Sequence, residues 1–177
     1  TSRSGRDGSS VDRIGLPLAS GEGIGVVGVI TGFASICVNG LEVHIDAATP
    51  VSENGRAAQT GSLAVGQFVS IDAVLTSGGL RARDVAIVHL IEGPVSARPD
   101  GGFAVMGEPI ELLPNARLPD GGKLPAAGSM VKVSGMRTPE GRIRATRIAP
   151  APELADASVI GDVTLRAGDS VRIEGLQ

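Results

Sequence analysis

One short pattern occurs three times along this chain, and it constrains the fold more than any other feature. Each copy has a leucine, a glycine three or four residues later, and β-branched residues three and five positions after that glycine. The copies are residues 63–73, 124–135 and 165–175. Glycine permits the positive φ of a tight turn, and residues two apart in a strand face the same side. The pattern therefore predicts a turn followed by a strand in each copy.

Hairpin signals surround the first two copies in the same order. Turn-forming residues follow each copy at 76–79 and 138–141, and a strand-like run comes next. Upstream, Asn39-Gly40 and Met106-Gly107 each separate two short apolar runs, as in a two-residue β-hairpin loop. Each unit thus contains about five short strands, the number in a Greek-key barrel of the OB type. We predict an all-β chain of two tandem OB-like barrels, with a partial third unit.

Composition agrees with this class and divides the chain. The 26 glycines and 11 prolines favour many turns, and with only three aromatic residues the core must consist of Val, Ile, Leu and Ala. We predict a flexible N-terminal tether at 1–23, one barrel at 24–91 and a second at 92–150. Residues 151–177 are interpreted as a linker plus the partial third unit. A lone strand is unstable, so we expect its strand to pair with another unit or with a neighbouring molecule.

A family resemblance rests on three runs of the sequence. Residues 28–40 (GVITGFASICVNG), 63–67 (LAVGQ) and 93–95 (GPV) resemble DUF5666, a bacterial domain of unknown function. The resemblance covers residues 24–150 as two copies and the third pattern as a fragment. It implies OB-like repeats in an exported, often membrane-tethered protein, and it brings no established activity. We therefore expect a periplasmic or cell-surface location, with a lipid anchor on a segment that precedes Thr1.

Charge and composition exclude several classes of function. The net charge is −3 and the chain has no Trp or Tyr, whereas single-strand nucleic-acid binding uses a basic surface and aromatic stacking platforms. The single cysteine, Cys37, excludes an internal disulfide. No apolar run is long enough to span a membrane. We expect neither nucleic-acid binding nor a transmembrane segment in this chain.

The Asn39-Gly40 turn predicts a candidate metal site. A two-residue loop places Val38 opposite Leu41, Ile36 opposite Val43 and Ala34 opposite Ile45 on a core-facing side. The other side then carries the candidate zinc or copper ligands Cys37, Glu42 and His44. The second unit lacks this trio, so the fold does not require it, and Cys37 is also compatible with a partly covered apolar role. His89 is interpreted as a surface histidine rather than a fourth ligand.

Basic residues gather on the strands predicted for the second unit. They form either an ordinary solvated face or a shallow site for an acidic partner, such as a polyanionic glycan or a lipid headgroup. These residues are Lys132, Arg137, Arg142, Arg144 and Arg147.

No catalytic pattern accompanies these features. The chain has no Gly-x-Ser-x-Gly motif, and neither histidine has an evident Ser or Cys partner in a catalytic order. We therefore predict a non-enzymatic binding or assembly module of the bacterial cell envelope without a cofactor. It would hold a protein or envelope component through exposed strand edges, with self-association through residues 158–177. The alternative is a metal-binding protein that uses Cys37, Glu42 and His44.

Overall fold

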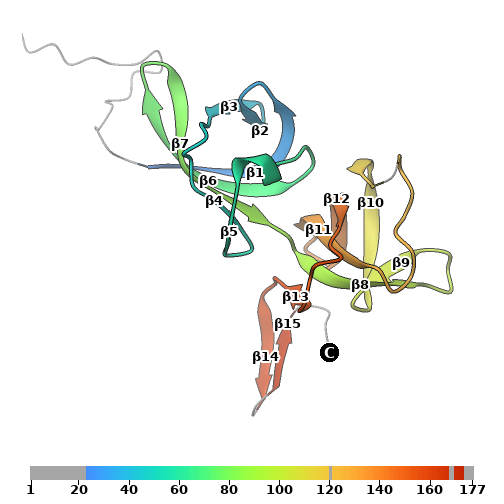
Figure 1. Ribbon diagram of the computed structural model, residues 1–177. Helices are drawn as coiled ribbons and strands as arrows, with labels where there is room; N and C mark the ends of the chain where they lie inside the picture. The colour runs from blue at the N-terminus through green and yellow to red at the C-terminus, as the bar shows by residue number, and fades with distance from the viewer. Residues whose placement is uncertain (1–22, 120, 168–169, 174–177) are drawn as a thin grey trace, which may run out of the picture.

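The computed structural model describes residues 23–119, 121–167 and 170–173, and these residues form β-strands with no α-helix (Figure 1). The first barrel contains β1 (Ile24–Phe33), β2 (Ile36–Val38), β3 (Leu41–His44), β6 (Phe68–Thr76) and β7 (Gly79–Val88). Between β3 and β6 lie β4 (Val51–Glu53), β5 (Arg56–Ala58) and a 3₁₀ turn, η1 (Thr60–Ser62). The second barrel contains β8 (Ile91–Ala97), β9 (Phe103–Val105), β10 (Glu108–Arg117), β11 (Met130–Arg137) and β12 (Ile143–Pro150). The chain continues through β13 (Ser158–Val159), β14 (Val163–Ala167) and β15 (Ser170–Ile173).

Both barrels close in the same strand order. In barrel one, β1 pairs with β2 and β6, β2 pairs with β3, and β7 pairs with β6 and β3. In barrel two, β8, β9, β10, β12 and β11 follow that order and close through the β11–β8 pairing. Each closed barrel has one parallel pair, β3–β7 or β10–β12. This is the OB-type Greek key, so the predicted tandem barrels are confirmed.

The repeated pattern forms strand β6 of barrel one and strand β11 of barrel two. Gly66 and Gly128 have φ of 90° and 85°, as the predicted turn requires. After these turns, β6 and β11 direct alternate residues into the two separate cores. Most buried core side chains are aliphatic, and Phe103 is the one buried aromatic residue among the described residues. Both cores therefore consist mainly of the aliphatic residues that the composition offers, with one phenylalanine in barrel two.

The two predicted hairpin turns also exist, and they explain a glycine in each barrel. Asn39 and Met106 have φ of 52° and 53°, and each is followed by a glycine with positive φ. The Asn39 side chain donates a hydrogen bond to the carbonyl of Val27 (2.7 Å) and covers Gly28. Met106 covers Gly93 in the same way, and a Cβ on either glycine would lie 2.5 Å from the covering side chain. The first strand of each barrel therefore needs a glycine at this point.

The first hairpin follows the predicted register, with two corrections to its core face. Val38 pairs with Leu41 and Ile36 pairs with Val43. Leu41, however, is 47% exposed at the end of the turn. Ala34 is exposed because it belongs to the turn between β1 and β2 rather than to a strand. The buried face is thus shorter than the alternation predicts.

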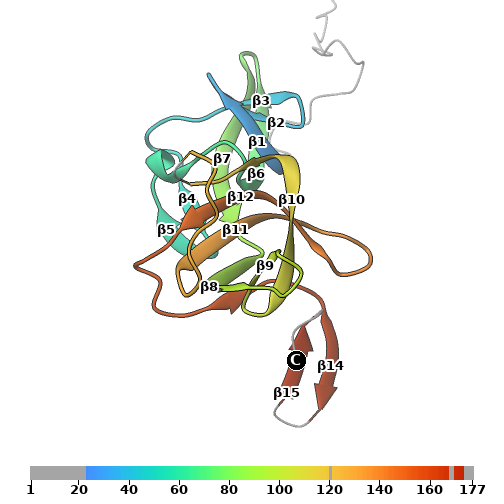
Figure 2. The same ribbon diagram turned by 90° about the vertical axis from the view of Figure 1, so that its right-hand side faces the viewer.

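The C-terminal segment differs from the expectation of pairing with another unit. Strand β15 pairs with β14 of the same chain, and the hairpin projects away from barrel two (Figures 1 and 2). The preceding β13 joins barrel two by pairing with β8. The predicted tether at residues 1–23 lies outside the described residues except for Gly23. No helix among the described residues has the length and apolar character needed to cross a membrane.

A glycine beside the β11–β12 bulge gives a test of this packing. A Cβ on Gly135 would overlap the main-chain carbonyl of Arg144, which cannot move without breaking the strand pairing. We expect Gly135→Ala to lower the free energy of unfolding by about 1–3 kcal/mol. Gly25→Ala, which meets open space, should change it by less than about 0.5 kcal/mol. Urea unfolding of both variants measures the difference, and equal effects would contradict the assigned register.

Candidate binding site at the barrel junction

The predicted metal ligands are neighbours but do not form a metal centre. Cys37 pairs with Glu42, as predicted. The Cys37 thiol donates toward the carbonyl of Ser35 (3.9 Å), and His44 Nδ1 lies 3.2 Å from the Ser35 hydroxyl. Because these two side chains interact with Ser35, they do not converge with Glu42 on one point. Among the described residues, no three His, Cys, Asp or Glu side chains are arranged to hold a metal ion.

The predicted basic face is divided among different surroundings. Lys132 and Arg137 lie an odd number of residues apart and therefore point to opposite sides of β11. The Arg137 side chain is 9% exposed and faces Glu108, whereas Arg142 and Arg144 lie near Glu111 at the surface. Arg147 donates to a carbonyl of barrel one. These basic residues therefore do not share one face, and a role for Lys132, Arg137, Arg142, Arg144 and Arg147 in binding an acidic partner stays a prediction.

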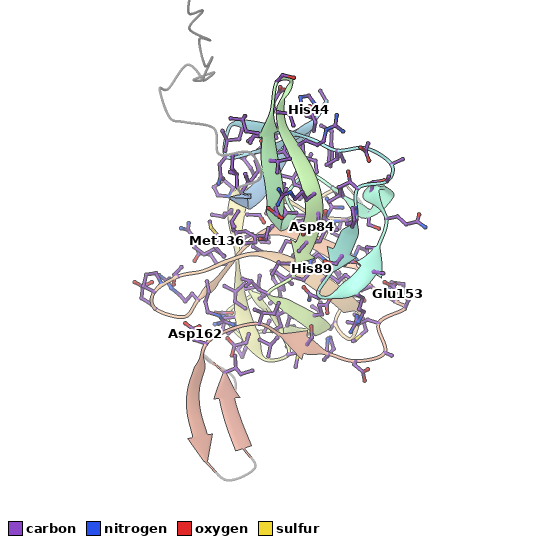
Figure 3. The ribbon with its side chains drawn as sticks, turned by 90° about the vertical axis from the view of Figure 1, so that its left-hand side faces the viewer. His44, Asp84, His89, Met136, Glu153 and Asp162 are labelled. Atoms are coloured by element: carbon purple, nitrogen blue, oxygen red, sulfur yellow. The ribbon has the colours of Figure 1, made fainter. Side chains whose placement is uncertain are left out.

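The prediction of a surface position for His89 is also wrong. Its side chain is 2% exposed, because it lies where β7 leads directly into β8 and both barrels cover it. Figure 3 shows His89 between the barrels, whereas His44 lies toward the far end of barrel one. Only His89 and Leu90 separate the last strand of barrel one from the first strand of barrel two. The junction is thus a direct packing contact and not a flexible linker.

The β4–β5 hairpin holds this junction from barrel one. Its turn, Asn54-Gly55, has positive φ at both residues. The Asn54 side chain accepts a hydrogen bond from the His89 main-chain N–H (2.8 Å) and donates to the His89 carbonyl (3.2 Å). On the barrel-two side, the Leu90 N–H donates to the carbonyl of Val133 (2.9 Å). Both linking residues are therefore fixed by hydrogen bonds to the barrels.

A second set of contacts joins the barrels through β12. The Thr146 hydroxyl donates to the carbonyl of Gly66 (2.6 Å), and Arg147 donates to the carbonyl of Val65 (3.1 Å). Thr146 is the extra residue of the bulge in β12, so the bulge directs its side chain out of the strand pairing. A Cβ on Gly66 would lie 2.9 Å from the Thr146 carbonyl. The glycine of the repeated pattern thus also permits the approach of barrel two.

The His89 imidazole connects the two barrels through its side chain. Nε2 lies 2.7 Å from Oε1 of Glu53 in barrel one, and Nδ1 lies 2.9 Å from the Ser134 hydroxyl in barrel two. A carboxylate only accepts hydrogen bonds, so Nε2 carries the proton and Nδ1 of the neutral ring accepts from Ser134. Burial lowers the pKa of His89, and the Glu53 carboxylate only partly opposes this effect. The buried ring is therefore neutral at pH 7.

Charges around Glu53 extend the cluster to the surface. Burial raises the pKa of Glu53, but the hydrogen bond from His89 and the charge of Lys132 outweigh it and lower the pKa overall. Lys132 lies 3.4 Å from Glu53 and 3.3 Å from Glu153. Burial lowers the pKa of Lys132, but the charges and hydrogen bonds of Glu53 and Glu153 raise it by more, so the pKa is raised overall. Lys132 therefore remains charged between two acids.

Ser134, His89 and Glu53 have the residue types of a hydrolytic triad, although their environment differs from one. The sequence shows no serine partner for either histidine, but the fold provides one for His89. Ser134 is 1% exposed and His89 is 2% exposed. Neither residue lines the pocket at the β4–β5 hairpin or the pocket beside Gly66 and Thr146. A catalytic serine must reach a substrate carbonyl. This arrangement is therefore suited to holding the barrels together.

A pocket of about 380 Å³ opens beside this cluster, between the β4–β5 hairpin and barrel two. Glu153 is one of its lining residues and lies near that hairpin in Figure 3. Glu92 lies inside and is 1% exposed. Its Oε2 accepts a hydrogen bond from Ser158 (2.6 Å), whereas Oε1 has no hydrogen-bond partner among the described residues. The lining residues are Glu53, Arg56, Ala57, Glu92, Lys132, Glu153, Leu154, Ala155 and Asp156.

Sequence reasoning missed this region, although one local signal was present. Asn54-Gly55 is a second Asn-Gly pair between strand-forming residues and predicts the β4–β5 hairpin by the same rule as Asn39-Gly40. Nothing local distinguishes His89 or Glu92 from surface residues. Their burial depends on how the two barrels pack against each other, and the spacing of residues in the sequence does not predict that packing.

The buried histidine predicts a dependence of stability on pH. Because its folded pKa lies below 6.5, the ordinary value for a histidine, the unfolded chain binds the proton more readily. Stability should therefore decrease as pH falls below about 6.5 toward the folded pKa. Above about pH 5 the Glu53 carboxylate, whose pKa is lowered from 4.5, contributes little to this change.

Thermal unfolding between about pH 7.5 and 5.5 measures this effect. We expect the midpoint to fall for the parent chain and to fall much less for His89→Gln. The matched control is His44→Gln, which replaces an exposed histidine and should retain the parental dependence. An identical pH dependence in His89→Gln and the parent would refute the assignment.

Comparison with known proteins agrees with the two-barrel architecture. A family model described as a domain of unknown function (DUF5666) matches residues 24–86 and 92–149, one match in each barrel. Searches of the curated proteins and of the solved structures gave no match. The chain belongs to the DUF5666 family, with two copies of its domain in tandem.

Proposed function

We propose that this protein is a non-enzymatic assembly module of the bacterial cell envelope that joins copies of itself through the β14–β15 hairpin. The observation that carries the proposal is the pairing pattern of this hairpin. It projects from barrel two, and within the described residues each of its strands pairs only with the other (Figure 2). Two-stranded hairpins are marginally stable alone, and open edges accept further strands.

The repeats indicate what the hairpin lacks. Strand β15 carries the third copy of the pattern that forms β6 and β11. In its barrel, β6 has β1 and β7 as neighbours, and β11 has β8 and β12. Among the described residues, strand β15 pairs with β14 alone. The equivalent strand has a neighbour on both sides in each barrel, so one edge of β15 is available for pairing.

A second copy of this chain is the partner that fits best. Two hairpins placed edge to edge around a two-fold axis would form a four-stranded sheet, with each copy offering the same edge. The base of the hairpin is already held in place. Strand β13 pairs with β8, and Ile173 packs against Gly161 close to Arg137. Such an anchored edge loses less conformational freedom on pairing than a free tail.

Other observations support a role in binding rather than catalysis. Ser134 and His89 are buried between the barrels, and the hydrogen bonds of the Ser134–His89–Glu53 group connect them. The envelope location is part of the proposal and follows from the exported character that the resemblance implies. In this view the two barrels form a rigid body, and the hairpin makes the contact with the partner.

Truncation tests the proposal. Removing residues 162–177 takes away the hairpin but keeps β13, whose Ser158 holds Glu92. We expect the full chain to form dimers that dissociate on dilution, and the truncated chain to be monomeric at every concentration. Size-exclusion chromatography with light scattering measures both. A chain in which a Gly-Ser segment of equal length replaces residues 162–177 is the matched control and should also be monomeric.

Two outcomes would overturn the proposal. One is a full-length chain that stays monomeric at high concentration, and the other is a dimer that persists after truncation. Circular dichroism of the truncated chain should show an unchanged barrel signal, since neither barrel takes a strand from the described part of the removed segment.

A further inference from the structure

The junction pocket contains a buried carboxylate whose hydrogen bonds are incomplete. Glu92 lies on β8 opposite Lys132 of β11 on one side and Ser158 of β13 on the other. Ser158 donates to one carboxylate oxygen, and Oε1 remains without a donor among the described residues. Buried polar atoms in folded proteins are nearly always hydrogen-bonded, and exceptions point to an unseen partner. A donor from outside the chain would complete this site.

The charge of the lining indicates a cationic donor. Four carboxylates line the pocket against two basic side chains. Lys132 already lies between Glu53 and Glu153. Arg56 and Asp156 are exposed and make no ion pair with another described residue. Acids outnumber bases in the lining even with Arg56 counted, and Glu92 and Asp156 are the two acids that form no ion pair with Lys132, so a positively charged group is favoured beside them.

The shape and the remaining lining limit the cation to an organic one. The carboxylates are not grouped as ligands of a metal ion among the described residues. The apolar part of the wall comes from Ala57, Leu154 and Ala155, which suit methylene groups. A volume of about 380 Å³ accommodates a small molecule and not a folded partner.

From these features we propose that the junction pocket binds a short aliphatic diamine or polyamine. One ammonium group donates to Oε1 of Glu92, the methylene chain lies along Leu154 and the two alanines, and the second ammonium pairs with Asp156 at the opening. The pocket has walls from both barrels, so the ligand bridges them. This site does not depend on the β14–β15 hairpin, and it can be present whether or not the chain dimerises.

Isothermal titration of the full chain with 1,4-diaminobutane at physiological salt tests the site. Two matched probes separate charge from shape: 1,4-butanediol has the same length without charge, and succinate has the opposite charge. We expect saturable binding of the diamine with one site per chain, and no binding of the other two. Equal binding of the diol, or no binding of the diamine, would overturn the proposal.

Variants then locate the site on the protein. Glu92→Gln keeps an acceptor for Ser158 and removes the charge, and we expect the affinity for the diamine to fall by about tenfold or more. The control is Glu111→Gln, an exposed acid on β10 outside the pocket, which should leave the affinity within about twofold. Retained binding in a folded Glu92→Gln chain would refute the role of Glu92.

A second variant keeps the test decisive if Glu92→Gln fails to fold. Ala57 is exposed on β5 at the pocket wall, so Ala57→Phe should fill the opening without disturbing either core. We expect Ala57→Phe to abolish diamine binding while the thermal midpoint stays close to that of the parent. Undiminished binding by this variant would place the diamine elsewhere and overturn the proposal.

Discussion

The structure depends on a neutral imidazole held between two barrels. His89 donates to Glu53 on one side and accepts from Ser134 on the other, while its main chain is bound by Asn54. A buried charge without full compensation is costly, and a neutral ring with two hydrogen bonds avoids that cost. Together with the contacts of Asn54, Thr146 and Arg147, this residue places barrel two on barrel one. The junction pocket exists because of that placement.

The two barrels share a strand order but differ where they meet. The connection between β3 and β6 forms the β4–β5 hairpin, whereas the equivalent connection after β10 has no strand in the part that the structure describes. The hairpin carries Glu53, Asn54 and Arg56, which reach the junction. Two barrels with the same strand order therefore form an asymmetric pair, because the β4–β5 hairpin is present in barrel one and faces barrel two.

The buried polar groups at the junction differ in whether their hydrogen bonds are complete. Ser134 and His89 are buried and bonded to each other, and His89 also bonds Glu53, so these groups contribute to the orientation of the barrels. Glu92, a few residues away on β8, is equally buried but retains an unused oxygen. A polar network whose hydrogen bonds are complete makes a packing arrangement specific. A buried polar atom without a hydrogen-bond partner indicates that a further group binds there. The difference between them separates a structural cluster from a candidate binding site.

The sequence by itself determined the repeated strands, the tandem barrels and the turns at Asn39-Gly40 and Met106-Gly107. These features follow from local rules, because alternation and glycine positions act within a few residues of chain. It did not determine the surroundings of His89, Glu92 or Arg147. Residues with the same local pattern face solvent or another barrel depending on how two closed barrels pack. Only the tertiary structure, through the β4–β5 hairpin and the bulge in β12, decided which side chains met at the junction.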